Sequence, residues 1–394
     1  MSQETGQVDQ LAPDASPAPE AAGVKKSGSS VSRLSFVFFN IAAVLALLLM
    51  FEGAASTYYA FRNTFAAPPV AESLYTQYDP ELGWVNLPNV YLPNMYGPGK
   101  FLRTNSQRFR NDADFTRSVP AGKARVICSG DSFTFGFGVD NEHNWPQLLA
   151  GHAPNLETVN MGQGGYGADQ AYLWYKRDGA ALEHNVQILA LIYPDLYRMQ
   201  HSSFNNYGKP VLTVENEHVV AGNVPVPRSM VVRAPRLVQV ENALSTLAIT
   251  RLLRSTLHLD NAAPRAPSEE RNEQTVRVLT YMLDDLAATN RTRNSTLVLA
   301  YLPIREELGW KSAGYWRGVL ADYARAHGIL YIDLSDDFRR LAPAEADKLF
   351  IPNGAVDALG AAGHYNEAGN AYVADLIYQK LLANPEIAAK LHAN

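Results

Sequence analysis

The fold of this chain is decided by the stretch Ala124-Arg-Val-Ile-Cys-Ser-Gly-Asp-Ser-Phe-Thr-Phe-Gly-Phe-Gly-Val139. Its first residues are mostly apolar and predict a buried strand, and its Gly-Asp-Ser step predicts a turn into a helix. Such a turn places Ser132 at the carboxyl end of the strand. Its N–H then lies at a helix N-terminus, where unpaired donors and the dipole favour negative charge. We therefore interpret Ser132 as an activated nucleophile that carries one oxyanion-hole donor.

Strand and helix patterns alternate along the rest of the chain. Apolar, β-branched runs predict strands at 124–129, 156–160, 187–193, 295–302 and 329–333. Helical patterns fall at about 144–151, 168–179, 237–257, 269–289, 312–327 and 366–384. This alternation predicts a flavodoxin-like, three-layer α/β/α fold with a five-stranded parallel sheet. Ligands in such folds bind at the carboxyl ends of the strands.

The N-terminal region predicts one membrane anchor. Residues 1–33 are rich in Ala, Pro, Gly, Ser and Gln without apolar periodicity, which indicates a disordered tail. The segment 34–55 begins with an uncharged run, Leu34 to Phe51, that is long enough to cross a bilayer. Lys and Arg residues precede this run, so the positive-inside rule leaves the tail in the cytoplasm. A cleaved signal peptide, with Ala54-Ala55-Ser56 as its cleavage site, is the alternative.

The remaining chain divides into two parts by composition. Residues 56–121 contain many Pro, Asn and Tyr and little periodicity, so we expect a membrane-proximal extension packed on the domain that follows. Residues 122–388 form that domain and carry the alternating pattern. Within it, the Asn-, Val- and Pro-rich segment 196–235 predicts an insertion over the carboxyl edge of the sheet, which is a candidate lid or substrate-binding region.

Composition argues against several kinds of function. A net charge of −5, with no basic block beyond a short N-terminal cluster, argues against nucleic acid as a partner. The single cysteine, Cys128, permits neither an intramolecular disulfide nor a cysteine-based zinc site, and we expect it to be a buried apolar residue. The sequence has no HExxH motif, EF-hand loop or clustered His and Asp spacing, so we predict no metal and no cofactor.

A glycine-rich turn follows the second predicted strand, as Asn160-Met-Gly-Gln-Gly-Gly-Tyr-Gly167. Glycines let the backbone approach a ligand closely and point N–H groups at it. We predict Gly165 as the second oxyanion donor and Asn160, Gly162 and Gly164 as substrate-binding residues. A flexible strand-to-helix turn without a ligand is the alternative interpretation.

A candidate base opens the final helical pattern, in Gly363-His-Tyr-Asn-Glu-Ala-Gly-Asn370. His364 lies just ahead of this helix, and no other histidine has a comparable setting. A neutral imidazole there is suited to take the proton of Ser132 as a general base. The ordered blocks thus predict a nucleophile, an oxyanion turn and a base.

The three blocks together resemble those of the SGNH, or GDSL, hydrolases, a family of serine esterases and acyltransferases with a flavodoxin-like fold. The resemblance covers about 122–384, and in it Ser132 corresponds to the nucleophile and His364 to the catalytic histidine. The earlier Leu82-Gly-Trp84 and Thr104-Asn-Ser-Gln-Arg-Phe-Arg110 are similar to the leader of membrane-anchored cell-envelope members. The resemblance implies action on the O-acyl groups of an envelope polysaccharide.

Two positions depart from the family pattern. Pro194 stands in Ile192-Tyr-Pro-Asp-Leu196, where the family places an asparagine that completes the oxyanion hole. Ala361 stands where the family places an aspartate, three residues before the histidine. Asp357 would reach His364 only if residues 358–363 loop out. A Ser–His–Asp triad with Asp357, a Ser–His dyad and a loss of catalysis therefore all remain open.

We expect a membrane-anchored serine esterase or O-acyltransferase that acts on O-acyl groups, O-acetyl in particular, of a cell-envelope polysaccharide. Its catalytic domain would lie on the periplasmic side of the inner membrane, where proteins of a polysaccharide machinery are possible partners. The alternative is a non-catalytic SGNH-fold component that binds carbohydrate or assists assembly in exopolysaccharide biosynthesis. Ser132 and His364 favour the enzyme, whereas Pro194 and Ala361 favour the alternative.

Overall fold

The structure of the chain is a computed structural model that describes residues 33–64, 74–205, 207–227, 249, 256, 269–309, 314–358 and 360–392. The tail before residue 33 lies outside the described residues. So does almost all of the helix predicted over 237–257, together with the end of the predicted insertion.

A five-stranded parallel sheet forms the centre of the domain and confirms the predicted fold class. Its strands are β5 (Ala124–Gly130), β6 (Leu156–Gly162), β7 (Val186–Leu191), β12 (Thr296–Tyr301) and β13 (Leu330–Asp333). They lie in the order β13-β12-β7-β5-β6, which is the flavodoxin-like order. All five agree with the predicted runs to within two residues. The first and third strands, β5 and β7, are neighbours, so their carboxyl ends lie side by side near the middle of the carboxyl edge of the sheet.

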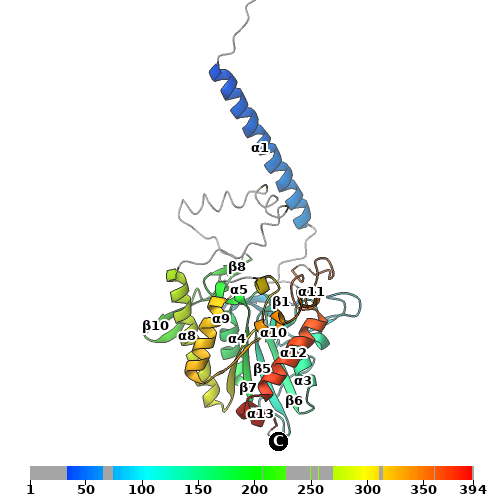
Figure 1. Cartoon of the computed structure of the whole chain (residues 1–394), viewed down its shortest axis with the longest axis vertical. Coiled ribbons are helices and arrows are strands. Elements are labelled where there is room, and N and C mark those ends of the chain that lie inside the picture. The colour runs from blue at the N-terminus through cyan, green and yellow to red at the C-terminus, as the bar shows by residue number, and fades with distance from the viewer. Residues whose placement is uncertain are drawn as a thin grey trace, which may run out of the picture.

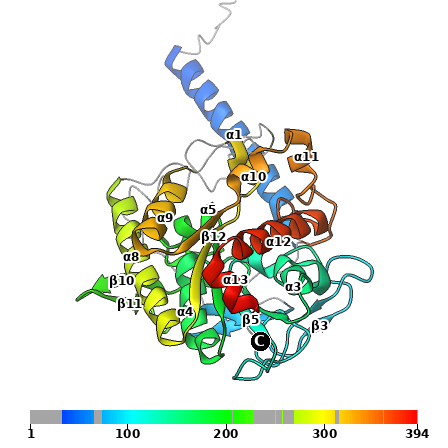
Figure 2. The same cartoon turned by 60° about the horizontal axis from the view of Figure 1, so that its bottom comes forward.

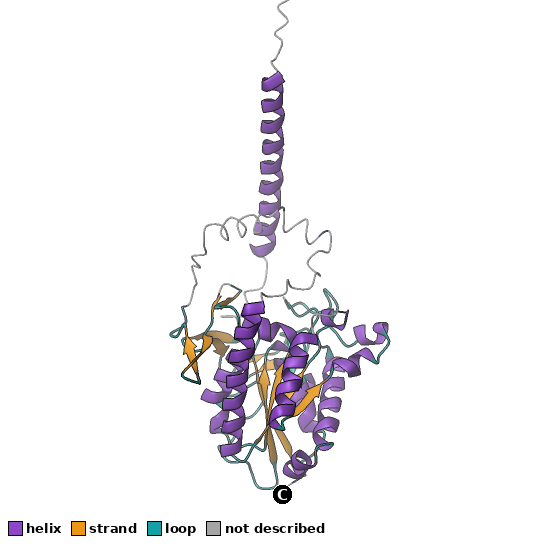
Figure 3. Cartoon of the chain, turned by 60° about the vertical axis from the view of Figure 1, so that its left-hand side comes forward, coloured by secondary structure: helices purple, strands orange, loops and turns teal. Residues whose placement is uncertain are grey.

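Helices cover both faces of this sheet (Figures 2 and 3). One face carries α4 (Ala168–Arg177), α8 (Glu269–Thr292) and α9 (Gly314–His327), and the other carries α3 (Trp145–Gly151), α12 (Glu367–Leu382) and α13 (Pro385–His392). Side chains of a strand alternate between its faces, so Ile127 packs with the first set and Val126 and Cys128 with the second. Cys128 is fully buried, as predicted.

Short elements connect the strands and helices at the carboxyl edge of the sheet. They are α2 (Ser132–Phe135), α5 (Tyr193–Arg198), α10 (Ser335–Arg339), α11 (Pro343–Asp347) and the 3-10 turns η1 (Asn141–His143), η2 (Gly179–Ala181) and η4 (Glu306–Gly309). The helix α2 lies so close to β6 that a Cβ on Gly162 would overlap the backbone nitrogen of Phe135. Gly162 therefore sets the position of residues 130–135, which we call the nucleophile turn because Ser132 is the predicted nucleophile.

The extension before the domain packs against the same edge. It contains the antiparallel pairs β1 (Thr76–Asp79) with β2 (Gly83–Asn86) and β3 (Tyr91–Leu92) with β4 (Leu102–Arg103). Fully buried Trp84 donates its Nε1 hydrogen to the carbonyl of Gly164, 2.8 Å away. Fully buried Arg110 donates to the carbonyls of Phe135, Gly136 and Val139. The extension thus holds both turns of the carboxyl edge from one side.

The described part of the insertion forms two small hairpins. They are β8 (Ser203–Phe204) with β9 (Tyr207–Gly208), and β10 (Val211–Glu215) with β11 (His218–Gly222). Lys209, which follows β9, makes a fully buried ion pair with Asp169 of α4. A buried pair of this kind loses several kcal/mol if one partner is removed, so it fixes the first hairpin against the domain.

One helix of the described chain is long and apolar enough to cross a membrane. The helix α1 (Arg33–Thr64) contains the span Ser35–Tyr58, of 24 residues and mean hydropathy 2.2. None of the side chains in its most apolar window is buried against the rest of the described chain. Figure 1 shows α1 standing away from the α/β domain. Length and composition alone therefore agree with the predicted anchor, whose orientation stays a prediction.

We predict that Gly162→Ala destabilises the domain by about 3 kcal/mol, because the added methyl group forces α2 away from β6. Gly151→Ala is the matched control, since a Cβ there meets nothing within 4 Å and alanine suits a helix better than glycine. Urea unfolding of the two variants and the wild type measures the effect. Equal midpoints for Gly162→Ala and wild type would contradict the tight packing of the nucleophile turn.

Candidate active site

Three consecutive residues begin the nucleophile turn and position its serine. Gly130 ends β5, and a Cβ there would overlap Thr134 Oγ1 and meet the Ala190 carbonyl. Asp131 is the N-cap of α2, and its Oδ1 accepts the Phe133 N–H at 2.8 Å. Ser132 is the first residue of the helix, so its N–H has no intrahelical acceptor. The turn therefore presents a hydroxyl and a free backbone donor at the same edge.

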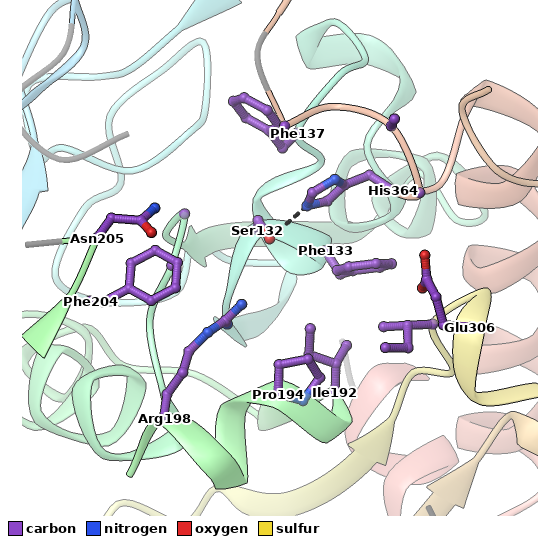
Figure 4. Close-up of a pocket in the computed structure, with 16 residues that line it drawn as sticks. Ser132, Phe133, Phe137, Ile192, Pro194, Arg198, Phe204, Asn205, Glu306 and His364 are labelled. Atoms are coloured by element: carbon purple, nitrogen blue, oxygen red, sulfur yellow. Dashed lines mark hydrogen bonds between the residues drawn. The ribbon is translucent and has the colours of Figure 1, made fainter. Parts of the chain in front are cut away.

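Ser132 and His364 lie in contact although 232 residues separate them in sequence. The distance from His364 Nε2 to Ser132 Oγ is 2.8 Å, as the dashed line in Figure 4 shows. The other ring nitrogen, Nδ1, lies 3.3 Å from the carbonyl oxygen of Ala361. A carbonyl only accepts hydrogen bonds, so it favours the tautomer with the proton on Nδ1. Nε2 then carries the lone pair and accepts the hydrogen bond of the serine hydroxyl.

Two phenylalanines hold the imidazole ring in place. Phe133 stacks on it with ring centroids 4.6 Å apart, and Phe137 meets it edge-on at 5.4 Å. Both residues belong to the nucleophile turn or the loop directly after it, so the turn that carries the serine also positions the base. These contacts orient the ring in a site where position 361 supplies no carboxylate.

Asp357, the predicted orienting carboxylate, is not brought to the histidine. Its side chain is exposed to solvent, and the Nδ1 contact that it was predicted to make is made by the backbone of Ala361. Ala361 itself is buried among Phe135, Phe137 and Ile351. The described geometry is therefore that of a Ser–His dyad with a main-chain partner for Nδ1. The loop that Asp357 would need brings Ala361, and not the aspartate, to the ring.

The glycine-rich turn contributes two of its four predicted residues to the pocket. Gly164 and Gly165 line it, and Gly165 has φ +78°, a conformation that L side chains rarely adopt. Asn160 and Gly162 lie buried beneath the turn. There the Oδ1 of Asn160 accepts the Gly162 N–H at 2.9 Å, and its amide donates to Asn144. These two residues support the turn and do not face the pocket.

An ion-pair cluster lies on the third side of the site. Asp195 is buried, accepts the Ile192 N–H at 3.0 Å and pairs with Arg198 at 2.8 Å. Arg198 also donates to Asp131 at 3.2 Å. Burial raises the pKa of Asp195 well above its usual range, and the nearby Asp131 carboxylate raises it further. Asp195 therefore binds its proton more tightly than an ordinary aspartic acid does, while Arg198 and the Ile192 N–H act in the opposite direction.

The pocket that these elements enclose has a volume of about 280 Å³. Its apolar wall includes Phe133, Phe137, Ile192, Pro194 and Phe204, and its polar groups besides Ser132 and His364 are Arg198, Asn205 and Glu306 (Figure 4). Ile304 also lines the wall. A small apolar chamber with a few directed polar groups is typical of a small-ligand site. The dyad opens into this chamber.

The surroundings keep His364 in its neutral form. Burial lowers the pKa of the imidazole below its usual 6.5, and the Arg198 cation lowers it further. Asp131 and the Ala361 carbonyl act in the opposite direction and raise this pKa, but burial is the larger cause. A neutral imidazole at pH 7 is the form that accepts a proton from the serine hydroxyl.

One cluster of the described residues has ligand atoms close enough for a metal ion. The side-chain atoms of Asp140, His143 and Glu367 lie within 4.8 Å of one another. His143 Nδ1 is 2.7 Å from Asp140 Oδ1, and Glu367 pairs with Lys100. The lysine already supplies the positive charge that a cation would bring, so these contacts form an ion-pair network at the side of the site.

Several pocket residues were not predicted from the sequence. Phe133 and Phe137 lie within the stretch 124–139, four residues apart. The sequence alone did not show that both would pack against His364. Arg198 lies just beyond the Ile192–Leu196 stretch and belongs to none of the sequence blocks. Asn205 and Glu306 lie in an insertion and in a 3-10 turn without a recognisable motif, so only the tertiary structure identifies them.

Solved structures similar to this chain include a lipase/acylhydrolase, lipolytic proteins of the G-D-S-L family and an acetyl xylan esterase. The lipase/acylhydrolase from Enterococcus faecalis is 10% identical, with a TM-score of 0.38, over 66% of this chain and 96% of that one. A member of the lipolytic protein G-D-S-L family from Veillonella parvula DSM 2008 is 15% identical, with a TM-score of 0.33, over 66% and 97%. The acetyl xylan esterase AlAXEase is 16% identical, with a TM-score of 0.37, over 65% and 98%.

No protein-family model and no curated protein matches the chain. The fold class therefore rests on the strand order and helix layers of this structure, and the chemistry of the site rests on its own geometry.

We predict that His364 titrates below pH 6.5, because burial disfavours its charged form more than Asp131 favours it. The ring C2 proton can be followed by NMR across a pH series and assigned by its absence in His364→Gln. Asp131→Asn should lower the midpoint further, because it removes the carboxylate that favours the charged ring. A midpoint above 6.5 in the wild type would contradict this account of the base.

Proposed function

We propose that the chain is a serine esterase or O-acyltransferase in which Ser132 is the nucleophile and His364 the general base. The observation that carries this proposal is the 2.8 Å contact between Ser132 Oγ and His364 Nε2 at the mouth of an apolar pocket. A hydroxyl is a weak nucleophile at neutral pH, and a neutral imidazole in contact with it supplies the activation that it lacks. The lowered pKa of His364 supports the same role.

The proposed reaction proceeds through an acyl-enzyme. Ser132 Oγ attacks the ester carbonyl carbon while its proton passes to His364 Nε2, and the N–H groups of Ser132 and Gly165 stabilise the oxyanion. The tetrahedral intermediate collapses when the imidazolium returns the proton to the leaving alcohol. Water or a sugar hydroxyl then attacks the acyl-serine, again with His364 as base. These two acceptors distinguish a hydrolase from a transferase.

The proposed substrate is an O-acylated, and in particular O-acetylated, polysaccharide of the cell envelope. The apolar wall of Phe133, Ile192, Pro194 and Ile304 suits a short acyl group. The polymer and its location come from the similarity of the extension to envelope members of the SGNH family. In this proposal α1 is a single-pass anchor of the inner membrane and the domain lies in the periplasm.

A non-catalytic carbohydrate-binding or assembly component remains the second candidate. It is favoured by Pro194, which has neither a side-chain donor nor an N–H, and by the exposed position of Asp357. Removal of one oxyanion donor typically reduces a rate by about 10²–10³, so a slow enzyme and a binding protein need to be separated by experiment.

We predict that the full-length chain in detergent reacts with a fluorophosphonate probe and hydrolyses p-nitrophenyl acetate, and that Ser132→Ala abolishes the labelling. His364→Gln should reduce turnover at least about 10⁴-fold, because the hydroxyl then loses its base. Ser129→Ala is the matched control. Its buried Oγ has no hydrogen-bond partner among the described residues, so its removal should leave labelling intact.

Labelling that survives Ser132→Ala would show that another group reacts. A wild type that neither labels nor turns over the ester would favour the binding protein. Incubation with an O-acetylated envelope polysaccharide, followed by measurement of free acetate and of transfer to an added oligosaccharide, then distinguishes hydrolase from transferase.

A further inference from the structure

The proposed oxyanion hole lacks one of its usual donors. Its two proposed backbone donors belong to Ser132 and Gly165, which line the pocket, and α5 would be expected to supply a third group. Pro194 occupies that place and lines the pocket with its apolar ring. A proline offers no hydrogen-bond donor at all, so position 194 contributes no donor to the oxyanion site.

Arg198 lies one helical turn after Pro194 on the same helix. Residues four apart share a helix face, and long side chains of a helix lean toward its N-terminus. The Arg198 side chain therefore runs back along the face that Pro194 occupies. Both residues line the pocket with Ser132. Figure 4 shows the guanidinium group reaching from α5 toward Ser132, beside Phe204.

The guanidinium group is fixed in place through one of its three nitrogens. The two hydrogens of Nη1 are shared among three acceptors, which are the Tyr166 carbonyl at 2.8 Å, Asp195 Oδ1 at 2.8 Å and Asp131 Oδ2 at 3.2 Å. Asp131 Oδ2 also lies 3.2 Å from Ser132 Oγ, so the serine and the arginine share one oxygen atom. The cation is thereby held in the immediate surroundings of the nucleophile.

The other two nitrogens of Arg198 are available to a ligand. Among the described residues, neither Nε nor Nη2 has a hydrogen-bond acceptor, although a guanidinium carries three N–H groups on these atoms. The side chain is only 16% exposed. Phe204 packs 5.0 Å from its central carbon, and Gly165 lies directly against the same ring. The free edge of the guanidinium is therefore rigid and borders the pocket.

We propose that Arg198 is a catalytic residue that donates hydrogen bonds to the oxyanion, in place of the side-chain donor that Pro194 lacks. This role rests on the proposed acyl-enzyme function. A fixed cation at a partly dry site stabilises developing negative charge without reorganisation during the reaction. Asp131 and Asp195 anchor the cation, and the glycine-rich turn and Phe204 set its orientation.

The test compares Arg198→Gln and Arg198→Lys with Arg317→Gln in the full-length chain. Arg317 is the matched control, because it is 17% exposed and also pairs with two carboxylates, Asp333 and Asp336, but does not line the pocket. With p-nitrophenyl acetate, Arg198→Gln should lose about 10²–10³-fold in kcat with little change in KM. Arg198→Lys should lose less, and Arg317→Gln should keep the wild-type kcat.

Chemical rescue separates this role from a structural one. In Arg198→Ala, millimolar methylguanidinium should restore part of kcat, whereas methylammonium at equal ionic strength should restore less. Near-UV circular dichroism shows whether each variant is folded. If Arg198→Gln and Arg198→Ala do not fold, the kcat of Arg198→Lys provides the test. A kcat within about threefold of wild type in a folded Arg198→Gln overturns the role.

An equal loss of kcat in Arg317→Gln, without rescue of Arg198→Ala, also overturns it, because the loss would then follow from a missing ion pair. Failure of the proposed function itself would give a different result. In that case the wild type would not react with the fluorophosphonate probe, and both proposals would fall together. A wild type that labels while Arg198 variants keep full turnover removes only the role of Arg198.

Discussion

The close approach of the nucleophile turn to the sheet is the constraint on which the rest of the site depends. The helix α2 begins directly at the end of β5 and packs against the end of β6, with Gly130 and Gly162 at the two contacts. Neither position has room for a side chain. The buried guanidinium of Arg110 then ties the far end of the turn to the extension through three carbonyl groups. The serine is thus positioned by the packing of its turn against the sheet and by the hydrogen bonds that the turn accepts from Arg110.

This packing also determines how the base is held. The turn carries Phe133, and the loop after it carries Phe137, so the histidine ring packs against side chains that directly follow Ser132 in the chain. The Ala361 carbonyl favours one tautomer but carries no full charge, so it does less than a carboxylate to stabilise an imidazolium. The carboxyl group that raises the pKa of His364, and so favours its charged ring, is that of Asp131. Orientation and charge compensation, which one aspartate usually supplies together, come here from different groups.

The sequence was sufficient for the sheet, and it singled out Ser132 and His364, which the structure brings into contact, because each depends on a local signal. Continuous apolar runs mark strands buried on both faces, and the Gly-Asp-Ser step and the histidine before the last helix mark the edge where strands end. Asp357 was proposed from its distance along the chain, but the path of the loop brings Ala361 to the ring instead. Arg198 escaped prediction as a pocket residue, because its role depends on the direction of a long side chain over Pro194. Such relations follow from tertiary packing and leave no motif.

The two departures from the family pattern have related electrostatic consequences. Without an aspartate beside Nδ1, the imidazolium is less stable, and the nearby Arg198 cation destabilises it further. The same cation would favour the oxyanion that forms when the proton is transferred. Asp131 connects the two effects, since it contacts both Ser132 and Arg198 and favours the charged histidine. With Arg198 in its proposed role, the site combines a weak base with a donor to the oxyanion. In such a site the transition state would be stabilised mainly by hydrogen bonds to the negatively charged substrate oxygen, and less by the basicity of the histidine.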